Sequence, residues 1–543
     1  MKVLIIGGVA GGMSAATRMR RLSESAQIVV LERGAHVSFA NCGLPYYVGG
    51  VIPKRESLLL QTPESLAARF RLDVRVRHEA TAVDPVGRTV TVRELDSGRE
   101  YVESFDELVL STGASAVVAR LPGVERALVL RDVTDVDRVV EAVGNARSAV
   151  VIGAGFIGVE MAENLVRRGI STTVIERGPQ VLGPLDVEMA APVAAEMRTH
   201  GIRLELGAEV STIEADTVTL SDGSVVPADL VIMSIGVRPE SGLAREAGLE
   251  IGSGAGVVVD DRLRTSMPHI YAVGDVVEKR DSVSGQSGLI PLANSANRQG
   301  RLVADVIAGL PAIDPPALGT AIVGVFGLTA AMTGWSEKRL RAAKRPFRVI
   351  HSHPLAHAGY YPDAAAMSLK LLVDPDTDQI LGAQAVGADG VDKRIDVLAT
   401  AMAGGIAASR LMDLELAYAP QFGSAKDAIN MLGYMADNLR IGALRTIQWH
   451  ELDEAISTGS HAVDVRTPEE FAAGSIPGAR NIPLDELRAR VEEIPAGPIL
   501  VLCQVGQRGN SATRLLNQLG REAVNLDGGY RTWRAAGADR ICR

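Results

Sequence analysis

The 543-residue chain has only three cysteines, so each can be judged by its own surroundings. Cys42 stands in Ser38-Phe-Ala-Asn-Cys-Gly-Leu-Pro-Tyr-Tyr47, and Cys503 begins Cys-Gln-Val-Gly-Gln-Arg508. Cys542 is the penultimate residue, and we expect no function for it. No two cysteines have Cys-x-x-Cys spacing, so the sequence predicts neither a disulfide scaffold nor a bound metal.

Cys42 has the features of a redox thiol that works without a second protein cysteine. A lone cysteine can carry two electrons as a sulfenic acid or as a mixed disulfide with a small thiol. The Gly-Leu-Pro that follows favours a helical turn starting just after Cys42. We expect the amides of that turn to lower the pKa of the Cys42 thiol and to favour the thiolate.

Cys503 follows a short apolar strand, 499–502, and the loop it begins ends at Arg508. Backbone amides in such a loop point at one sulfur anion and can stabilise a thiolate or a cysteine persulfide. We expect Arg508 to support this loop or to meet a charge on the substrate.

The elements that position Cys42 begin with a strand, a glycine-rich turn, a helix and a second strand over residues 3–32. Gly7 allows the tight turn, Gly12 lets the helix pack on the strand, and Glu32 can accept hydrogen bonds from ribose hydroxyls. The helix N-terminus would face a pyrophosphate. Val9 stands where the middle glycine of this dinucleotide-binding motif is expected.

A second copy of the pattern has the complete motif, Gly153-x-Gly155-x-x-Gly158, and Glu176 ends its second strand. Two such folds in one chain imply two bound dinucleotides. Two further short strands end in small residues, at Thr112-Gly113 and at Gly274-Asp275. A flavin needs a carboxylate near its ribityl chain and close backbone approach to its rings, and these two segments suit that need.

The order of these motifs resembles the flavoprotein disulfide reductases with two dinucleotide folds, over about residues 1–440. The resemblance implies two sets of cofactor-binding residues. FAD would be bound by Gly7, Gly8, Val9, Ala10, Gly12, Glu32, Arg33, Thr112, Gly113, Gly274 and Asp275, and NAD(P)H by Gly153, Gly155, Ile157, Gly158 and Glu176. Glu176 should repel a 2′-phosphate and favour NADH, while the neighbouring Arg177 leaves some tolerance for NADPH.

Within that superfamily many members use a Cys-x4-Cys disulfide, but here Tyr47 occupies the second position. NADH oxidases and peroxidases that use a sulfenic acid carry a histidine in the first turn, where this chain has Ala10. The sequence resembles instead the coenzyme A-disulfide reductases and their persulfide-reducing relatives. By that resemblance, coenzyme A lies beside Cys42 or is disulfide-bonded to it.

The phosphates of coenzyme A need cations. Ser14, Arg18 and Arg21 are spaced so that they lie on one side of the first helix, which would present a hydroxyl and two guanidinium groups together. With the contacts that the resemblance adds, the predicted coenzyme A-binding residues are Ser14, Arg18, Arg21, Ser38, Asn41, Asn297, Arg301 and Lys426. Ser38 and Asn41 would contact the pantetheine near Cys42, and Lys426 would meet a phosphate.

Two tyrosine-bearing segments of the third domain match the same family. One offers Tyr360 or Tyr361, with Tyr360 preferred, and the other offers Tyr418. In the family, a tyrosine from each segment reaches across a dimer to the thiol site, so the resemblance implies a homodimer with active sites shared between subunits.

Residues 446–543 resemble a rhodanese sulfurtransferase. The match rests on the Cys503 loop and on three further motifs, which are Val463-Asp-Val-Arg-Thr-Pro-Glu-Glu-Phe471, Gly474-Ser-Ile-Pro-Gly-Ala-Arg-Asn-Ile-Pro483 and Leu526-Asp-Gly-Gly-Tyr-Arg-Thr-Trp533. Cys503 would accept or hand over sulfane sulfur.

The sequence thus predicts an α/β chain with two Rossmann-like dinucleotide-binding domains, an α+β dimerisation domain and a C-terminal rhodanese-like α/β domain. The expected boundaries are 1–114 with 245–318 for FAD, 115–244 for NAD(P)H, 319–440 for the dimerisation domain and 446–543 for the rhodanese domain. The predicted activity is reduction of coenzyme A disulfide, persulfide or polysulfide by NADH through FAD, Cys42 and coenzyme A. The alternatives are an NADH oxidase or peroxidase, and a sulfur carrier whose reductase half is a scaffold.

The composition of the chain limits the classes of partner that we expect. Lys and Arg number 56 against 65 Asp and Glu, and the resulting net charge of −9 argues against nucleic acid or an anionic membrane as the main partner. The uncharged stretch 315–336 is long enough to span a bilayer, but it is rich in Gly, Ala and Thr and is expected to contain a core strand. We expect a cytoplasmic protein.

Overall fold

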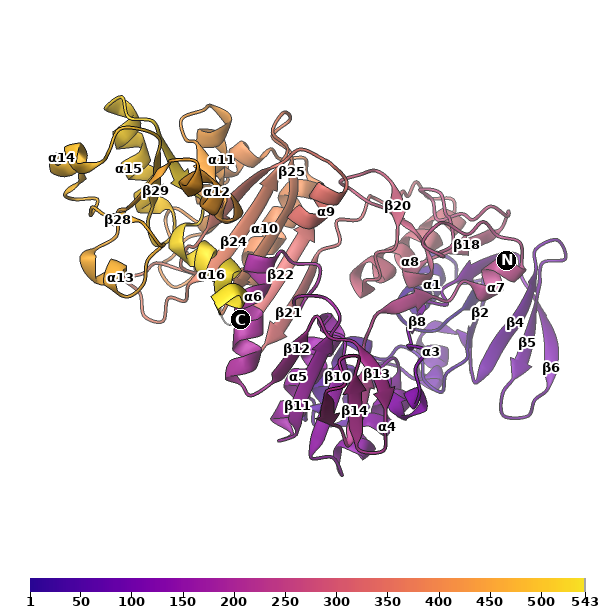
Figure 1. Cartoon of the computed structure of the whole chain (residues 1–543). Helices are drawn as coiled ribbons and strands as arrows, with labels where there is room; N and C mark the ends of the chain where they lie inside the picture. Colours follow the sequence, from indigo (N-terminus) through magenta and orange to yellow (C-terminus); the bar gives the residue numbers. More distant parts are fainter. Residues whose placement is uncertain (542–543) are drawn as a thin grey trace. The chain divides into compact units, whose positions relative to one another are not determined.

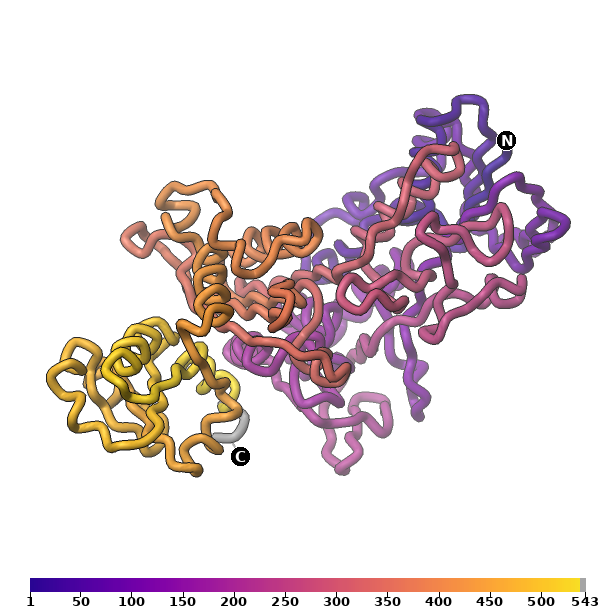
Figure 2. Tube along the Cα trace, turned by 90° about the horizontal axis from the view of Figure 1, so that it is seen from above, coloured from indigo at the N-terminus to yellow at the C-terminus, as the bar shows by residue number. Residues whose placement is uncertain are grey.

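A computed structural model describes residues 1–541 of the chain, so Cys542 lies outside the described residues. Figure 1 shows the helices and strands, and Figure 2 shows the course of the chain. The chain forms two compact units, one made of Met1–Pro179 and His200–Gly319, the other of Gln180–Thr199 and the chain from Thr320 onward.

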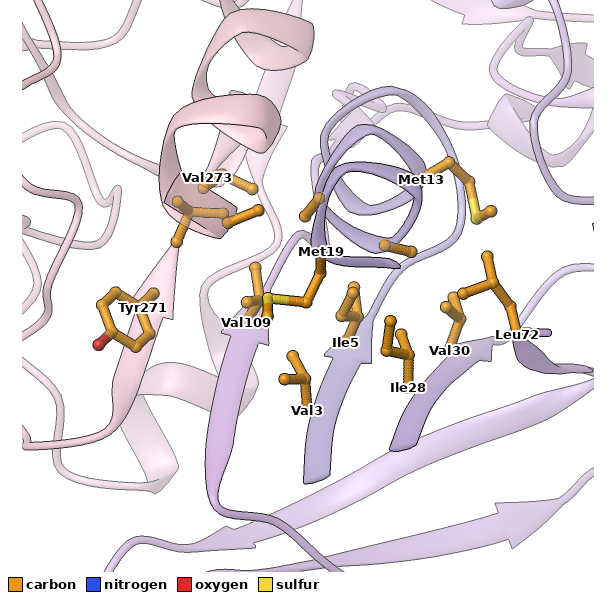
Figure 3. Packing of buried hydrophobic residues seen from close by; sticks show 14 of the residues in the cluster. Val3, Ile5, Met13, Met19, Ile28, Val30, Leu72, Val109, Tyr271 and Val273 are labelled. Atoms are coloured by element: carbon orange, nitrogen blue, oxygen red, sulfur yellow. The ribbon is translucent and has the colours of Figure 1, made fainter. Parts of the chain in front are cut away.

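The first unit contains a five-stranded parallel sheet in the order β18-β7-β1-β2-β3. Its strands are β1 (Lys2–Ile6), β2 (Gln27–Glu32), β3 (Asp73–Val76), β7 (Glu107–Leu110) and β18 (Ile270–Ala272). Both faces of β1 are buried, which explains its unbroken apolar sequence. On one face, Ile5 and Val30 pack with Met19 of helix α1 (Ala10–Leu22), as Figure 3 shows.

A second parallel sheet in this unit has the order β12-β11-β10-β16-β9. Its strands are β9 (Ala127–Leu128), β10 (Ser148–Ile152), β11 (Ser171–Glu176), β12 (Arg203–Leu206) and β16 (Leu230–Met233). Helix α5 (Phe156–Arg167) connects β10 to β11 and buries its apolar side against them. The unit therefore contains two copies of the strand, turn and helix arrangement predicted from the glycine motifs.

Shorter elements complete the first unit. The helices are α2 (Leu44–Val48), α3 (Pro63–Phe70), α4 (Val133–Val143), α7 (Gly242–Glu246) and α8 (Ala293–Ile307). The antiparallel strands are β4 (His78–Asp84), β5 (Thr89–Glu94), β6 (Glu100–Ser104), β8 (Ala114–Ala116), β13 (Val210–Ile213), β14 (Thr217–Leu220), β15 (Val225–Pro227), β17 (Val237–Pro239), β19 (Lys279–Arg280) and β20 (Ser287–Gly288).

The second unit begins with an antiparallel sheet in the order β21-β22-β25-β24-β23. Its strands are β21 (Ala321–Val325), β22 (Leu328–Gly334), β23 (Arg348–Ser352), β24 (Met367–Val373) and β25 (Ile380–Gly387). The accompanying helices are α6 (Val187–Thr199), α9 (Glu337–Ala342), α10 (Val391–Ala403) and α11 (Ala428–Arg440). Strand β23 lies at one edge of this sheet.

Residues 446–526 form a five-stranded parallel sheet in the order β26-β30-β29-β27-β28. Its strands are β26 (Thr446–Ile447), β27 (His461–Asp464), β28 (Arg480–Asn481), β29 (Ile499–Leu502) and β30 (Ala523–Leu526). The helices are α12 (Leu452–Ser457), α13 (Pro468–Ala472), α14 (Leu487–Arg490), α15 (Gln507–Gln518) and α16 (Gly529–Ile541).

The predicted fold class is confirmed, with two differences in detail. The segment Gln180–Thr199, expected inside the NAD(P)H-binding domain, packs in the second unit. Helix α1 begins at Ala10, so part of the glycine-rich sequence that was expected to form the turn belongs to the helix. The uncharged stretch 315–336 contains β21 and β22. None of the helices among residues 1–541 is long and apolar enough to cross a membrane.

Candidate functional site

The first glycine-rich turn joins β1 to α1 at a point where no side chain fits. Gly7 has φ +102°, and a Cβ placed there would lie 2.1 Å from the Ser111 carbonyl oxygen. A Cβ on Gly12 would lie 1.9 Å from the Gly7 carbonyl oxygen. Val9, the departure from the motif, precedes α1 with φ −111°, so this position does not need the left-handed conformation that favours glycine. The turn is therefore compatible with Val9 in place of glycine.

Two carboxylates hold the two glycine turns in the same way. Glu32 accepts hydrogen bonds from the amides of Gly8 (2.8 Å) and Gly34 (2.7 Å). In the second fold, Glu176 accepts from the amide of Ala154 (2.8 Å), and Gly178 donates to it in the same way (2.7 Å). A carboxylate has about four acceptor positions, so each retains capacity for ribose hydroxyls. The orientation of both acids is thus fixed before a nucleotide binds.

The second turn leaves room for a phosphate. A Cβ on Gly158 would lie 1.9 Å from the Gly153 carbonyl oxygen, so this glycine is needed for packing of α5 on β10. A Cβ on Gly155 would meet nothing within 4 Å, although Gly155 precedes the helix N-terminus. Ile157, in the first turn of α5, is 40% exposed. This open approach to the first amides of α5 fits a pyrophosphate.

The predicted flavin segments meet beside the first sheet. Thr112 donates its hydroxyl to the Glu240 carbonyl oxygen, and Gly113 (φ +70°) and Gly274 (φ +85°) adopt left-handed conformations. Asp275 lies 3.9 Å from the Lys279 ammonium, yet its Oδ1 is buried without a hydrogen-bond partner. A buried carboxylate oxygen with unused capacity is what a flavin ribityl hydroxyl would satisfy.

Two other predicted FAD residues lie at the start of α1 and just after β2. Ala10 is the first residue of α1. Arg33 follows β2, is largely exposed and approaches Glu79 at 4.0 Å. Together with Asp275 and the turn at Gly7, these residues fit FAD.

Cys42 lies in a short 3-10 turn, Asn41–Gly43, that leads into α2, and it is exposed. The side-chain oxygen of Asn41 accepts the Cys42 amide at 3.0 Å and lies 3.6 Å from the sulfur. Partial desolvation of the sulfur, together with the charges of Glu160 and Asp275, raises the pKa of the thiol. The expectation that the following turn lowers this pKa is therefore corrected, because α2 has only five residues and acidic groups face the thiol.

A contact that the sequence reasoning missed ties the Cys42 segment to the second dinucleotide fold. The Tyr46 hydroxyl donates to Glu160 on α5 at 3.0 Å. A Cβ on Gly49, just after α2, would lie 1.9 Å from the Asn164 side-chain oxygen, so α2 and α5 are in close contact. Burial raises the pKa of Glu160, although the Tyr46 hydrogen bond opposes this. The acidic residue of the Gly-Val-Glu160 sequence was the available signal.

The predicted coenzyme A residues come together at the contact of α1 and α8. A Cβ on Gly300 would lie 2.2 Å from the Gly11 carbonyl oxygen, so the helices touch there. This places the Ser14 hydroxyl 2.9 Å from the Asn297 side-chain oxygen.

Arginines on these two helices share one carboxylate, Asp305. Arg18 is paired with it at 2.7 Å, and Arg301, mostly exposed, lies 4.0 Å from it. Arg21 lies over the Phe70 ring instead, at 5.3 Å. The charge on this side of α1 is thus partly neutralised by Asp305, which the spacing argument did not anticipate.

Other predicted residues lie near the same groups or in the second unit. Ser38 has φ +47° and donates its amide to the Gly8 carbonyl oxygen at 2.8 Å, which holds the Cys42 segment against the first turn. Lys426 belongs to the second unit and is exposed.

The tyrosines of the second unit form an exposed pair. The hydroxyls of Tyr360 and Tyr418 are 2.8 Å apart, and the side chains are 75% and 48% exposed. Tyr361 turns its ring toward His357 instead. The two segments are joined by the Ala358 amide, which donates to the Gly423 carbonyl oxygen. The structure therefore brings Tyr360 and Tyr418 together on the surface of the second unit.

Cys503 lies at the end of β29 and is fully buried. Its carbonyl oxygen accepts the Tyr530 amide at 2.8 Å, and Gly506 (φ +89°) turns the loop into α15. Arg508 forms two hydrogen bonds of 2.7 Å to Glu470 on α13. This pairing lowers the pKa of Glu470 to about 2. Arg508 therefore links α15, the helix that follows the loop, to α13.

A second arginine near this loop was missed by sequence reasoning. Arg466 is buried, pairs with Asp464 at 2.7 Å and donates to the Gln504 side chain at 3.1 Å. Its guanidinium lies 4.3 Å from the centre of the Tyr530 ring. The Asp-Val-Arg motif at the end of β27 was the signal for this support of the Cys503 loop.

Comparison with known protein families gives matches to three parts of the chain. Residues 1–300 match the pyridine nucleotide-disulphide oxidoreductase family, 320–428 the dimerisation domain of that family, and 448–536 the rhodanese-like domain.

Similar individual proteins cover most or all of the chain. Coenzyme A disulfide reductase of Staphylococcus aureus (strain JH9) is 34% identical over 80% of this chain and 99% of its own length. The crystal structure of reduced Bacillus anthracis CoADR-RHD is 46% identical, covers 99% of this chain and 98% of that one, and has a TM-score of 0.98. A NAD-dependent persulfide reductase from A. fulgidus is 36% identical, covers 98% of this chain and 100% of its own, and has a TM-score of 0.92.

Proposed function

Because the chain belongs to the pyridine nucleotide-disulphide oxidoreductase family, we propose that it uses NADH and FAD to reduce coenzyme A disulfide and related persulfides or polysulfides at Cys42. The observation that carries the proposal is a lone exposed thiol beside the Asn41 amide group, at the contact of the two dinucleotide folds. A rhodanese-like domain on the same chain supports sulfane sulfur as part of the substrate range.

The chain's own residues have separate tasks in this reaction. Cys42, as thiolate, attacks one sulfur of the substrate, releases one thiol or sulfide and keeps the other half as a mixed disulfide. When bound, NADH and FAD supply the two electrons that break this mixed disulfide and return Cys42 to the thiol. Asn41 holds the sulfur, and the carboxylates of Glu160 and Asp275 favour its protonated form between turnovers.

Coenzyme A is proposed as the resident small thiol. Ser14 with Asn297, and Arg18 with Arg301, form two polar pairs on neighbouring helices that suit the nucleotide end. Asp305 already balances the arginines, so the phosphates would compete with this carboxylate for the guanidiniums. Arg21 and Lys426 are the further cations proposed.

A homodimer is proposed for the complete site. The dimerisation-domain match and the exposed Tyr360 and Tyr418 support it, since two phenols on a surface suit burial against a second copy. In the dimer each phenol pair would hydrogen-bond the leaving sulfur at the partner's Cys42. Tyr361 packs on His357 and is assigned no part in this.

Cys503 is proposed as the carrier of sulfane sulfur, held by the loop that Arg508 and Arg466 brace. We also propose that the protein acts in the cytoplasm, where disulfides are kept reduced and both described cysteines would remain thiols.

The deciding experiment has two parts. Purified protein is denatured without reductant and the released FAD is identified, and a reductant is then added and the solution tested for coenzyme A. The Cys42→Ser variant should bind FAD at the wild-type level yet lose reduction of coenzyme A disulfide and of a small persulfide with NADH. Full retained turnover in this variant would exclude Cys42 as the redox thiol.

A further inference from the structure

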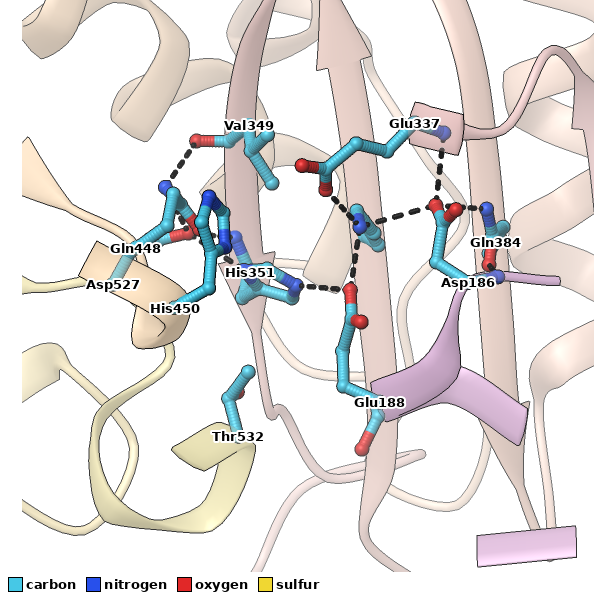
Figure 4. Close-up of polar contacts among 12 residues, drawn as sticks. Asp186, Glu188, Glu337, Val349, His351, Gln384, Gln448, His450, Asp527 and Thr532 are labelled. Atoms are coloured by element: carbon cyan, nitrogen blue, oxygen red, sulfur yellow. Dashed lines mark hydrogen bonds and ion pairs between the residues drawn. The ribbon is translucent and has the colours of Figure 1, made fainter. Parts of the chain in front are cut away.

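A buried histidine joins the rhodanese-like domain to the sheet of the dimerisation domain. His351 lies on the edge strand β23 and is 1% exposed. Its Nδ1 is 2.7 Å from the Asp527 carboxylate, and its Nε2 is 3.0 Å from the Glu188 carboxylate on α6 (Figure 4). Both ring nitrogens face carboxylates, and an ionised carboxylate only accepts hydrogen bonds, so this geometry suits an imidazolium that donates from both nitrogens.

The groups around His351 favour a positive charge on its ring. Burial opposes protonation of the ring, but its hydrogen bonds to Asp527 and Glu188 outweigh this and raise its pKa to about 9. The Lys370 ammonium on β24 is the opposing charge, and it is itself surrounded by Asp186, Glu188 and Glu337.

Two further polar side chains lie close to His351 and Asp527. His353, on the loop after β23, has its pKa lowered to about 3 by burial and by the charges of His351 and Arg531, so it stays neutral. The Gln448 side chain approaches Asp527 at 3.3 Å.

Asp527 is the first residue of the turn that contacts Cys503. It follows directly after β30 and precedes Gly528 and Gly529, which have φ +67° and +62°. After this turn, the Tyr530 amide donates to the Cys503 carbonyl oxygen at 2.8 Å and the Arg531 amide to the Gln504 carbonyl oxygen at 3.0 Å. Asp527, whose carboxylate contacts His351, is therefore the first residue of the segment that holds the Cys503 loop.

At Gly528 and Gly529 the turn packs closely against both His351 and the Cys503 loop. A Cβ on Gly528 would lie 2.9 Å from the Cβ of His351, and a Cβ on Gly529 would lie 2.4 Å from the Cys503 carbonyl oxygen. One backbone turn thus separates His351 from Cys503. A second anchor lies beside it, because the Thr532 hydroxyl is 2.8 Å from Nε2 of His353.

We propose that His351 and His353 are positioning residues for the Cys503 loop, so that sulfur transfer at Cys503 depends on docking of the rhodanese-like domain against strand β23. This inference rests on the proposed role of Cys503 as sulfur carrier. The imidazolium fixes the Asp527 carboxylate, the turn after Asp527 fixes the loop, and the loop sets the direction of the sulfur. Loss of the His351 proton places one ring nitrogen lone pair against one of the two carboxylates and weakens this hold, leaving the His351 backbone amide as a donor to Asp527 at 2.9 Å.

The test measures single-turnover loading of Cys503 from thiosulfate. In this step the Cys503 thiolate takes the outer sulfur of thiosulfate, forming the persulfide and releasing sulfite, so neither an oxidant nor a reductant is needed. The gain of one sulfur atom is followed by mass spectrometry from pH 7 to 10 in the full-length protein. Thiosulfate keeps its charge over this range.

His351→Gln keeps a hydrogen-bond donor but cannot be charged. Since displacements of about 1 Å at a reacting group cost up to ~100-fold, we expect loading at pH 7 to slow by about tenfold. The difference from wild type should disappear above pH 9, where the wild type also loses the charge. FAD content and NADH-linked reduction of coenzyme A disulfide should be unchanged. His461→Gln, which loses only a contact to the Ala496 carbonyl oxygen, is the matched control and should load normally.

Several outcomes would overturn the inference. Wild-type loading by a folded His351→Gln protein would do so, and so would a slowing that is the same at every pH. If that variant does not fold, Thr532→Val replaces it, since it removes only the bond to His353. Loading at the wild-type rate in Thr532→Val would then count against the proposal, and slower loading would support it. Loading that persists in Cys503→Ser would instead overturn the carrier role and leave the contacts of His351 as structural.

Discussion

At the scale of single residues, the two cysteines have opposite surroundings. Cys42 is exposed and faces acidic groups, whereas Cys503 is buried at the end of a strand under a loop braced by two arginines. The first environment raises the pKa of a thiol that must be reached by a substrate. The second fixes the direction of a sulfur atom.

Glu160 should control the acidity of Cys42. Its negative charge is one cause of the raised thiol pKa, so Glu160→Gln should lower that pKa and speed alkylation of Cys42 at pH 8. Iodoacetamide labelling rates from pH 6 to 10, with Cys503→Ser as background, measure the shift. Tyr46→Phe keeps the charge and should not speed the reaction, and an unchanged profile in Glu160→Gln would show that desolvation alone sets the pKa.

Glu176 should set the preference between the two nicotinamide nucleotides. Because its carboxylate is fixed by two backbone amides where the adenosine ribose would bind, kcat/KM should favour NADH over NADPH. Glu176→Gln should reduce the preference by about tenfold, the loss of one charged hydrogen bond. Steady-state kinetics with both nucleotides provide the measurement, and equal efficiencies in the wild type would show that Arg177 overrides the acid.

At the scale of elements, the glycine turns show what sequence patterns can predict. Gly7 and Gly153 were predicted as tight turns, and both have φ of +102°. The resemblance to coenzyme A-disulfide and persulfide reductases and the fold class are confirmed by the comparisons. These features depend on local backbone geometry, which a few residues specify.

Other features escaped prediction because they depend on contacts between distant segments. Asp305 neutralises Arg18 across about 290 positions of sequence, and Tyr46 reaches Glu160 on another fold. The lowered thiol pKa was predicted from a helix that has only five residues, too few amides to outweigh nearby carboxylates. Spacing along one helix carries no information about what packs on it.

The two glycines of the second turn should respond differently to alanine. Gly158→Ala places a methyl group 1.9 Å from a carbonyl oxygen and should destabilise the protein by about 1–3 kcal/mol, the usual cost of overpacking. Gly155→Ala meets nothing in the protein and should keep the wild-type Tm while raising KM for NADH. Thermal unfolding and kinetics of both variants provide the test, and equal losses of Tm would contradict it.

At the scale of the whole molecule, a fully buried lysine holds the second unit together. Lys370 pairs with Asp186, Glu188 and Glu337 at 3.0, 2.5 and 2.6 Å, drawing α6, α9 and β24 to one point. Burial opposes the charge of Glu188, but Lys370 and His351 outweigh it and hold the pKa of this carboxyl well below its usual 4.5. This contribution to stability is present at neutral pH and is lost as the pH falls through the folded-state pKa.

Removing the central charge should be costly. Lys370→Met leaves three buried carboxylates without their cation and should destabilise the protein by about 3–5 kcal/mol. Lys370→Met combined with Glu188→Gln should recover part of this loss. Denaturant unfolding of the single and double variants checks the prediction. If Lys370→Met left the free energy of unfolding unchanged, the cluster would already be uncharged in the wild type.

The two cysteines should divide the substrates by size. Coenzyme A disulfide is small enough to react at Cys42 directly, whereas sulfane sulfur on a bulky donor must first be collected. Cys503→Ser should therefore impair NADH oxidation with a protein-sized persulfide donor and leave the rate with coenzyme A disulfide nearly unchanged. Equal losses with both donors would show that Cys503 is needed for every turnover or only for the structure.

Helix α6 has a consequence for how the chain folds during synthesis. Strands β11 and β12 are neighbours in a sheet of the first unit, but residues 180–199, which connect them in the sequence, belong to the second unit. The partners of Glu188 are His351 and Lys370, well over a hundred residues later, so they emerge from the ribosome only after the sheet strands on either side of α6. A nascent chain ending near residue 320 would carry α6 with its polar residues unpaired and its apolar side uncovered. Translation beyond β24 is therefore required before this crossover is complete, and chaperones would meet it during that interval.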